Sequence, residues 1–370
     1  MMTETGISDF LLPVLLYIGS IFSRSISSSP FGNAAAEAMQ AGWMIPGLAP
    51  NPYFIQALML YSISVYWCNE PERGRELLDE AINGAFILGM HQKDFAEHNG
   101  NGDPVLEESW RRTWWQIHVT DVHIAGSLHI YKGLSNKFPI TTELPCEEQC
   151  YETGVIPVPA SLKNYNTREF SDIEFSSFAQ LIGFTQGISR VLATREYKDI
   201  ENAKVTSANA DTMITAWCSL LPASKRRPLR DDGSVDELLF KANILMHTYI
   251  VDLHRQLSYL QYSAIESISK YIFHEPKLLL ERDKIRLKMG VLKMLGEYWP
   301  AGQREYQTMG IIAREILALK EEEFQIPKET PILPLDTLDF NFDFEVNWAC
   351  DLFANGTGPF HMDLSVGSLV

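Results

Sequence analysis

The segment EESWRRTWWQIHVTD, residues 107–121, constrains the fold of this chain more than any other stretch. Trp110, Trp114, Ile117 and Asp121 recur in it at spacings of four, three and four, so they share one face of a helix. Two indoles on one helical face are typical of a helix that packs into a hydrophobic core. Because Asp121 lies too far along the helix to pair directly with an arginine near its start, we expect a partner from another helix.

Acidic and basic side chains are paired at the start of the same segment. Glu107 precedes Arg111 by four residues, and Glu108 precedes Arg112 by four, which is the favoured orientation of ion pairs along a helix. Each such pair contributes only about 0.2–0.5 kcal/mol when exposed, whereas a buried arginine needs a carboxylate partner. Two interpretations stay open. One is a structural latch, with two tryptophans in the core and two arginines tying helices together; the other is an effector pocket lined by Arg111, Arg112 or Trp115.

Helical periodicity dominates the rest of the chain, and the alternating patterns typical of strands are scarce. Asn51 followed by Pro52 predicts a helix start, because Asn caps well and Pro at the first helical position loses no needed hydrogen bond. The polar residues 95–103 and the proline-bearing residues 134–165 predict irregular connections. We predict helices over about residues 52–68, 71–91, 104–131, 171–198, 201–221, 235–260, 277–298 and 303–323.

The segment AINGAFILGMH, residues 81–91, closes one of these predicted helices. Leu88 and Gly89 complete its inner stripe, and Gly84 and Gly89 permit the close approach of a neighbouring helix. His91 is expected at the helix C-terminus, where the helix dipole stabilises a partly charged imidazole. We therefore favour a structural capping role for His91 over a ligand-binding or catalytic role.

The character of the sequence changes at Phe324. Helical patterning stops, and prolines precede a stretch in which acidic and aromatic side chains alternate. This composition is typical of disordered activation segments that dock into a coactivator groove, although the stretch could instead pack back onto the helical body. The predicted fold is therefore an all-α multi-helix array over residues 1–323 with a mobile tail over residues 324–370. The candidate activation residues are Asp336, Asp339, Phe340, Phe342, Phe344 and Trp348.

A single dense basic cluster, SKRRPLR, occupies residues 224–230. Lys225, Arg226 and Arg227 are the candidate residues of a nuclear import signal. The alternative is a loop of solvated bases between two helices.

Composition limits the partners and the chemistry of the chain. A formal net charge of −16 repels phosphate, so this chain alone is a poor candidate for binding DNA or RNA. The five cysteines are scattered, with Cys146 and Cys150 as the one close pair, which predicts neither a disulfide framework nor a closed zinc site. The longest apolar run, residues 10–22, is too short to span a bilayer, and no base precedes it. We expect a buried helix there, rather than a signal peptide, and no membrane partner.

Three segments together resemble the middle regulatory region of fungal zinc-cluster transcription factors. They are FIQALMLYSISVYW (54–67), AINGAFILGMH (81–91) and EESWRRTWWQIHVTD (107–121), and their order and spacing also match the family. The similarity is strongest over residues 50–150. The chain departs from the family in having Val122 where an arginine often follows the aspartate, and Gly133-Leu134-Ser135 where Gly-Arg-Pro is common. A run of six cysteines, the family's zinc-binding DNA-recognition unit, does not occur in this sequence.

The resemblance implies a nuclear regulator of RNA polymerase II transcription, acting on a metabolic (secondary-metabolite) gene cluster. Its expected partners are coactivators or other transcription proteins and a second subunit, in a homodimer or heterodimer. DNA would be contacted only through a zinc cluster absent from this chain or through a partner, and no cofactor is expected in the chain itself.

Two other classes of function stay open. The first is a stand-alone helical interaction or small-molecule-sensing protein that acts on partner regulators. The second is a helical enzyme of the terpene-synthase type, suggested by the acidic run at residues 231–236, where Gly233 favours a turn over a magnesium motif. The sequence contains no glycine-rich phosphate loop, no nucleophile elbow and no zinc-protease motif, so we do not expect an enzyme.

Overall fold

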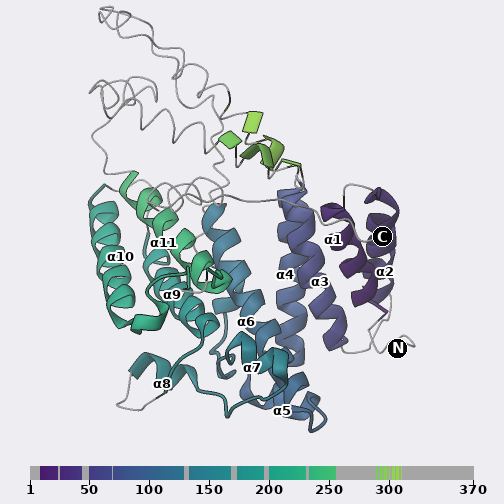
Figure 1. Cartoon of the computed structure of the whole chain (residues 1–370), viewed down its shortest axis with the longest axis horizontal. Coiled ribbons are helices and arrows are strands. Elements are labelled where there is room, and N and C mark those ends of the chain that lie inside the picture. Colours follow the sequence, from purple (N-terminus) through teal and green to yellow (C-terminus); the bar gives the residue numbers. More distant parts are fainter. Residues whose placement is uncertain are drawn as a thin grey trace, which may run out of the picture.

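The structure, a computed structural model, describes residues 9–23, 26–43, 50–68, 70–128, 133–167, 173–195, 200–230 and 233–255, with short pieces between 289 and 310. The regular elements of these stretches are helices, with one isolated β-bridge between Leu229 and Val235, which confirms the predicted all-α array (Figure 1). In chain order they are α1 (Leu11–Phe22), α2 (Ser29–Trp43), α3 (Pro52–Trp67), α4 (Pro71–Leu88), α5 (Lys93–Asn99), α6 (Pro104–Ser127), the 3-10 turn η1 (Leu134–Asn136), α7 (Glu148–Thr153), α8 (Leu162–Thr167), α9 (Ser177–Leu192), α10 (Ile200–Leu220), the 3-10 turn η2 (Ala223–Lys225) and α11 (Glu237–Arg255).

Helix α6 runs through the middle of the molecule, with α1 to α4 on one side and α9 to α11 on the other (Figure 1). Gln56 Nε2 donates to Thr113 Oγ1 at 2.9 Å, and ten residues further along α3 the hydroxyl of Tyr66 lies 2.9 Å from that of Ser127. Because both pairs advance in the same direction, α3 and α6 run parallel. Helix α4 connects them and runs antiparallel to both, which makes these three helices the centre of the array.

The start of each central helix follows from the residue before it. Asn51 Oδ1 accepts a hydrogen bond from the backbone N–H of Tyr53 at 2.9 Å, and Pro52 opens α3 as predicted. The same arrangement opens α6, where Asp103 Oδ1 accepts from the N–H of Val105 at 2.9 Å. These caps fix where each helix begins, and hence which side chains face the core.

The core is continuous across α6. Trp110, Trp114 and Trp115 are each at most 2% exposed, as the helical spacing of the first two predicted. On the far side of α6, the rings of Phe184 in α9 and Trp217 in α10 meet edge to face at 5.2 Å. Aromatic side chains therefore fill both halves of the array.

Helices α3 and α4 pack at unusually short range. A Cβ added at Gly74 would lie 2.7 Å from the Cα of Tyr66, so only a hydrogen fits between the two backbones. Of the two glycines predicted to make a close approach, Gly84 does so, against the side chain of Ile55 in α3, whereas Gly89 does not. Gly89 ends α4 in the left-handed conformation, with φ of +80°, which glycine adopts without strain.

The predicted loop over residues 95–103 is wrong in its first half, because residues Lys93–Asn99 form α5. Phe95 and Ala96 are buried, and the ring of Phe95 meets that of Trp110 at 6.2 Å. The turn itself is confined to residues 100–103, where Asn101 and Gly102 have positive φ. The apolar face of this short helix therefore packs against α6.

The exposure of α1 contradicts a second prediction, that residues 10–22 form a buried helix. Val14 is fully buried, but Leu15, Leu16 and Phe22 are 41–49% exposed, so only one face of the predicted buried helix is covered. That face packs on α3, where Phe10 meets Phe54 at a ring distance of 5.3 Å. Among the described helices, none combines the length and the apolar character that a bilayer span requires.

Candidate functional site

The charged side chains at the start of α6 converge on one carboxylate. Glu108 is fully buried, and its Oε2 accepts a hydrogen bond from Arg111 Nε at 2.9 Å. Its Oε1 accepts from Arg112 Nε at 3.0 Å and from the backbone N–H of Cys146 at 2.9 Å. One buried negative charge is therefore shared by two guanidinium groups and one amide, which is the pairing that a buried carboxylate requires.

Arg112 extends this cluster to the connection that follows α6. Its Nη1 donates to Glu148 Oε2 at 2.6 Å, and its Nη2 donates to the carbonyl oxygen of Cys146 at 3.0 Å. The guanidinium also lies 4.3 Å from the centre of the Tyr151 ring. Burial lowers the pKa of Arg112, but the carboxylates of Glu148 and Glu108 raise it by more, so the pKa is raised overall and the side chain stays charged.

Trp115 holds the same connection one turn further along α6. Its Nε1 donates to the carbonyl oxygen of Glu143 at 2.8 Å, and its side chain is fully buried. We call the group formed by Glu108, Arg111, Arg112 and Trp115, with the backbone of residues 143–146, the α6 latch. The α6 latch fastens a connecting segment to the central helix mainly through that segment's main chain.

A second buried ion pair fastens α6 to α4. Asp121 is fully buried, and Arg75 Nη2 lies 2.8 Å from its Oδ1, at an angle outside that of a hydrogen bond. Asp121 Oδ2 accepts from the backbone N–H of Ser135 at 2.7 Å, and Arg75 also pairs with Asp79. The partner of Asp121 thus comes from another helix, as expected, while the nearest carboxylate to Arg111 is Glu108 on its own helix.

Ser135 joins Asp121 to a buried histidine. The Ser135 hydroxyl lies 2.9 Å from His118 Nδ1, and His118 has no exposed surface. Burial lowers the pKa of His118 to about 4, although the negative charge of Asp121 acts in the opposite direction. His118 is therefore neutral at physiological pH and serves as a hydrogen-bonding core residue.

The structure corrects the role expected of His91. Helix α4 ends at Leu88, so His91 lies beyond the Gly89 cap and packs as a ring against Phe86, at 5.0 Å, and Trp114, at 5.7 Å. Burial lowers its pKa, so the imidazole is not held in a charged form by the helix dipole. Its carbonyl oxygen instead accepts hydrogen bonds from the backbone N–H groups of residues 141 and 142.

The basic cluster is divided by the fold. Lys225 is buried, and its ammonium group pairs with Glu147 and donates to Ser177 Oγ at 2.9 Å. Arg226 and Arg227 are exposed, and Arg226 Nε donates to the carbonyl oxygen of Leu221 at 3.2 Å. Lys225 is thus engaged in the body of the protein, and a nuclear import signal there would rest on the two arginines.

Two other sets of candidate residues fall wholly or partly outside the described part of the chain. The candidate activation residues between Asp336 and Trp348 all lie outside the described residues. In the acidic run, Asp231 and Asp232 also lie outside them, while Gly233 adopts φ of +85° in a turn and Asp236 pairs with Arg230 at 3.0 Å. The part of this run that is described forms a turn and the start of α11.

The described residues do not form a cluster of metal ligands. Within the described stretches, no group of three or more His, Cys, Asp or Glu side chains converges as a metal site would require. Cys146, the candidate with a close cysteine neighbour, has a thiol pKa raised to about 12 by burial and by the carboxylate of Glu108. A thiol that resists ionisation is a poor zinc ligand.

Arg75 is the residue of this region that sequence reasoning missed. It precedes Leu78 by three residues and Ile82 by seven, so it lies on the apolar stripe of α4. A charge on an apolar stripe is the signal that a buried partner exists. The signal would have indicated a carboxylate on a neighbouring helix, and Asp121 is that carboxylate.

Comparison with known proteins identifies the family of the chain. A model of the family described as the fungal specific transcription factor domain matches residues 5–219, which is more than half of the chain. The chain belongs to this family. The match includes α6, both arginines of the α6 latch and Asp121.

A curated relative gives a more specific likeness. The chain is 31% identical over 264 residues to the C6 finger domain transcription factor iacK of Pestalotiopsis fici. The aligned part is 70% of this chain but only 38% of that protein, so the chain spans well under half the length of its relative. No solved structure matches the chain.

Proposed function

We propose that this chain is the regulatory module of a fungal transcription regulator of the zinc-cluster type, acting in the nucleus on transcription by RNA polymerase II. The family match over residues 5–219 carries the proposal, because it covers the helices that make up the centre of the array. The chain is not an enzyme in this proposal, and its surfaces serve contacts with other proteins.

DNA contact is assigned to a zinc cluster outside this sequence or to a partner subunit. The relative is named for a C6 finger, whereas the five cysteines of this chain are scattered and, where described, do not converge. A net charge of −16 also opposes direct binding to phosphate. Zinc is accordingly proposed only for that DNA-binding unit.

A tethered reporter tests the proposal. The full chain is fused to an unrelated DNA-binding domain in a fungal host, and expression is measured from a promoter carrying that domain's sites. We expect output to change several-fold relative to the unfused DNA-binding domain. Unchanged output would argue for the alternative, a protein that senses small molecules and acts only through a partner regulator.

The tail is tested in the same assay. Deletion of residues 335–353 is expected to reduce activation, because it removes the acidic and aromatic side chains that would dock into a coactivator. The matched variant changes Phe340, Phe342 and Phe344 to Ser and keeps both length and charge. Activation that survives both changes would remove the activation segment from the proposal.

The nuclear location and the target genes need separate measurements. Changing Arg226 and Arg227 to Gln in a fluorescent fusion is expected to shift the protein toward the cytoplasm, with Lys163→Gln as a control at an exposed lysine of α8. Chromatin immunoprecipitation should place the protein at promoters of one secondary-metabolite gene cluster. Binding scattered over unrelated genes would contradict that part of the proposal.

A further inference from the structure

A cavity of about 290 Å³ opens where α3, α6 and α11 meet. Its apolar lining comes from Trp67 and three isoleucines, namely Ile63, Ile124 and Ile244. A cavity of this size lies at the lower end of the range for small-molecule sites and holds one ring with a short chain. The α6 latch and the pair of Arg75 with Asp121 line no part of it.

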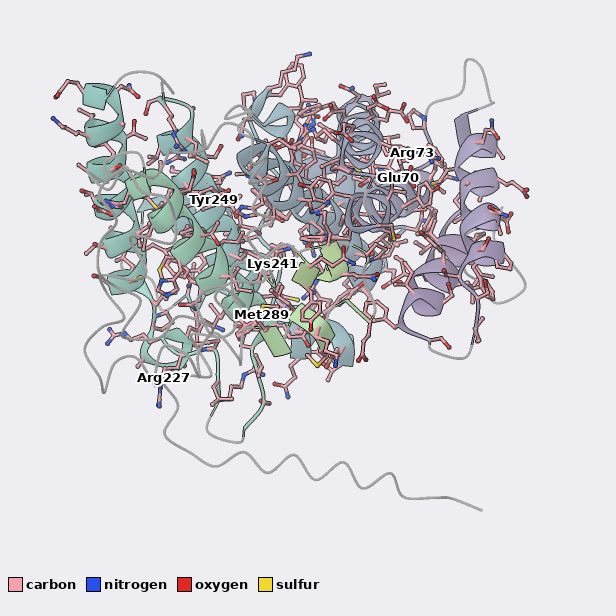
Figure 2. All side chains as sticks on the ribbon, turned by 90° about the horizontal axis from the view of Figure 1, so that it is seen from above. Glu70, Arg73, Arg227, Lys241, Tyr249 and Met289 are labelled. Atoms are coloured by element: carbon pink, nitrogen blue, oxygen red, sulfur yellow. The ribbon has the colours of Figure 1, made fainter. Side chains whose placement is uncertain are left out.

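The polar side of the cavity carries one cation. Lys241 of α11 is partly buried and lines the cavity with Thr120 and His123 of α6. Figure 2 labels Lys241 and Tyr249, which both belong to α11, and the hydroxyl of Tyr249 contacts His123 of α6. Within the described stretches, no carboxylate pairs with the ammonium group of Lys241, in contrast to the buried arginines of α4 and α6.

His123 does not compete with Lys241 for a ligand. Its Nδ1 lies 2.9 Å from the hydroxyl of Tyr249, and its Nε2 lies 3.1 Å from the hydroxyl of Thr185. Both ring nitrogens are therefore occupied. Burial, together with the positive charge of Lys241, lowers the pKa of His123 well below its usual value, so the imidazole is neutral.

We propose that this cavity binds a small apolar molecule with one carboxylate group. The carboxylate pairs with the ammonium group of Lys241, and the apolar body lies against Trp67 and the isoleucines. A partly desolvated cation beside an apolar wall favours this combination, because charge-assisted hydrogen bonds are stronger where water is excluded. A neutral apolar molecule fills the same space but leaves Lys241 unpaired.

Such a ligand would contact helices from both sides of α6. Trp67 belongs to α3, whereas Lys241 and Ile244 belong to α11. An occupied cavity adds contacts across the central helix that the empty protein lacks. Binding is accordingly expected to raise the melting temperature of the folded chain.

Calorimetric titration of the purified full chain tests the proposal with a matched pair of probes. The first is 3-phenylpropionate, and the second is 3-phenylpropionamide, which has nearly the same shape but no charge. We expect the carboxylate to bind on the order of tenfold more tightly than the amide. Absence of saturable carboxylate binding, or equal affinity for the two probes, would overturn the proposal.

Variants test whether the preference for the carboxylate probe arises in this cavity. Lys241→Met should lower the affinity for 3-phenylpropionate to that for 3-phenylpropionamide and leave the affinity for the amide unchanged. Ile244→Phe and Ile244→Trp should abolish binding of both probes by filling the space, and either one suffices if the other fails to fold. Lys163→Met, at an exposed lysine of α8, is the control and should leave both affinities unchanged. A preference for the carboxylate that survives Lys241→Met would place the site elsewhere.

The outcome does not depend on the proposed role in transcription. The titration uses no DNA and no cell, so it can succeed where the reporter fails. Equally, if the reporter responds but no carboxylate binds, only the proposed ligand of the cavity is contradicted, and the proposed function stands.

Discussion

Arg75 of α4 reaches across the centre of the array and places its Nη2 2.8 Å from Oδ1 of Asp121, a carboxylate with no solvent exposure. The contact joins the beginning of one helix to the end of another that runs in the opposite direction. Burial lowers the pKa of Arg75, but the carboxylates of Asp121 and Asp79 raise it by more, so the charge is kept. This charged pair is therefore one of the contacts that hold α4 on α6, together with the packing of the Phe86 ring against Trp114.

Arg75→Met is expected to lower the free energy of unfolding by about 3–5 kcal/mol, because it leaves Asp121 as a buried charge without its cation. Urea unfolding followed by circular dichroism measures the loss. The control is Arg73→Met, which removes a pair with Glu70 in which both side chains are more than half exposed. Such pairs contribute at most about 1 kcal/mol, so equal losses in the two variants would contradict the role of Arg75.

Arg112→Met should loosen the α6 latch. The change removes the hydrogen bonds to Glu108, Glu148 and the Cys146 carbonyl, and we expect a loss of about 2–3 kcal/mol with faster amide exchange at residue 146. Glu148→Gln is the control, because Glu148 is 53% exposed and should contribute less than about 1 kcal/mol. If exchange at residue 146 is unchanged in Arg112→Met, the latch does not hold the connection.

The buried His118 predicts a dependence of stability on pH. Its pKa is about 4 in the folded chain and about 6.5 when unfolded, so between these values the unfolded chain binds a proton that the folded chain does not. The free energy of unfolding therefore falls as the pH drops from 6.5 to 4, by roughly 3 kcal/mol, and the contribution is absent above that window.

Unfolding titrations at several pH values between 7 and 4 measure this effect. His118→Asn should reduce the pH dependence relative to the unchanged chain, since an amide does not titrate, and the remainder is expected from His123 and His91, whose pKa values burial also lowers. His98→Asn, at an exposed histidine of α5, should leave the dependence as it is. The prediction is wrong if both variants follow the same curve.

Gly74→Ala tests the contact between α3 and α4. Alanine favours a helix over glycine by about 1 kcal/mol, but here its Cβ would meet the backbone of Tyr66 at 2.7 Å. The melting temperature should therefore fall. Gly19→Ala is the matched change in α1, where nothing lies within 4 Å, and it should raise the melting temperature slightly. The same sign for both changes would contradict the close packing.

Local signals in the sequence were sufficient for the starts of α3 and α6 and for the buried face of α6, but not for α2, α7 and α8, which were not predicted. Asn51 and Pro52 specify a helix start by their own chemistry, and the spacing of Trp110 and Trp114 follows from helical geometry alone. The short helix at Phe95 was missed because its neighbours are polar and its apolar face spans only two residues. The helix is stabilised by contact with the ring of Trp110, which belongs to another helix, α6.

Tertiary features of the site could not be obtained in the same way. The α6 latch closes on the main chain of residues 143 and 146, and a backbone amide or carbonyl has no signature in the sequence. The neutrality of His91 depends on how deeply its ring is buried, which is a property of the assembled core. Arg75 differs from these features, since its place on an apolar stripe can be read from the sequence although it was not predicted.

The α6 latch binds the main chain of the connecting segment, which affects the sequence changes that this segment tolerates. Trp115, Glu108 and Arg112 bind the carbonyl of Glu143 and the amide and carbonyl of Cys146, groups that every amino acid except proline provides. Substitutions at these two loop positions can accumulate without releasing the anchor, whereas substitutions at the three helical positions cannot. The loop is thus free to diversify in sequence while its path over the central helix is preserved.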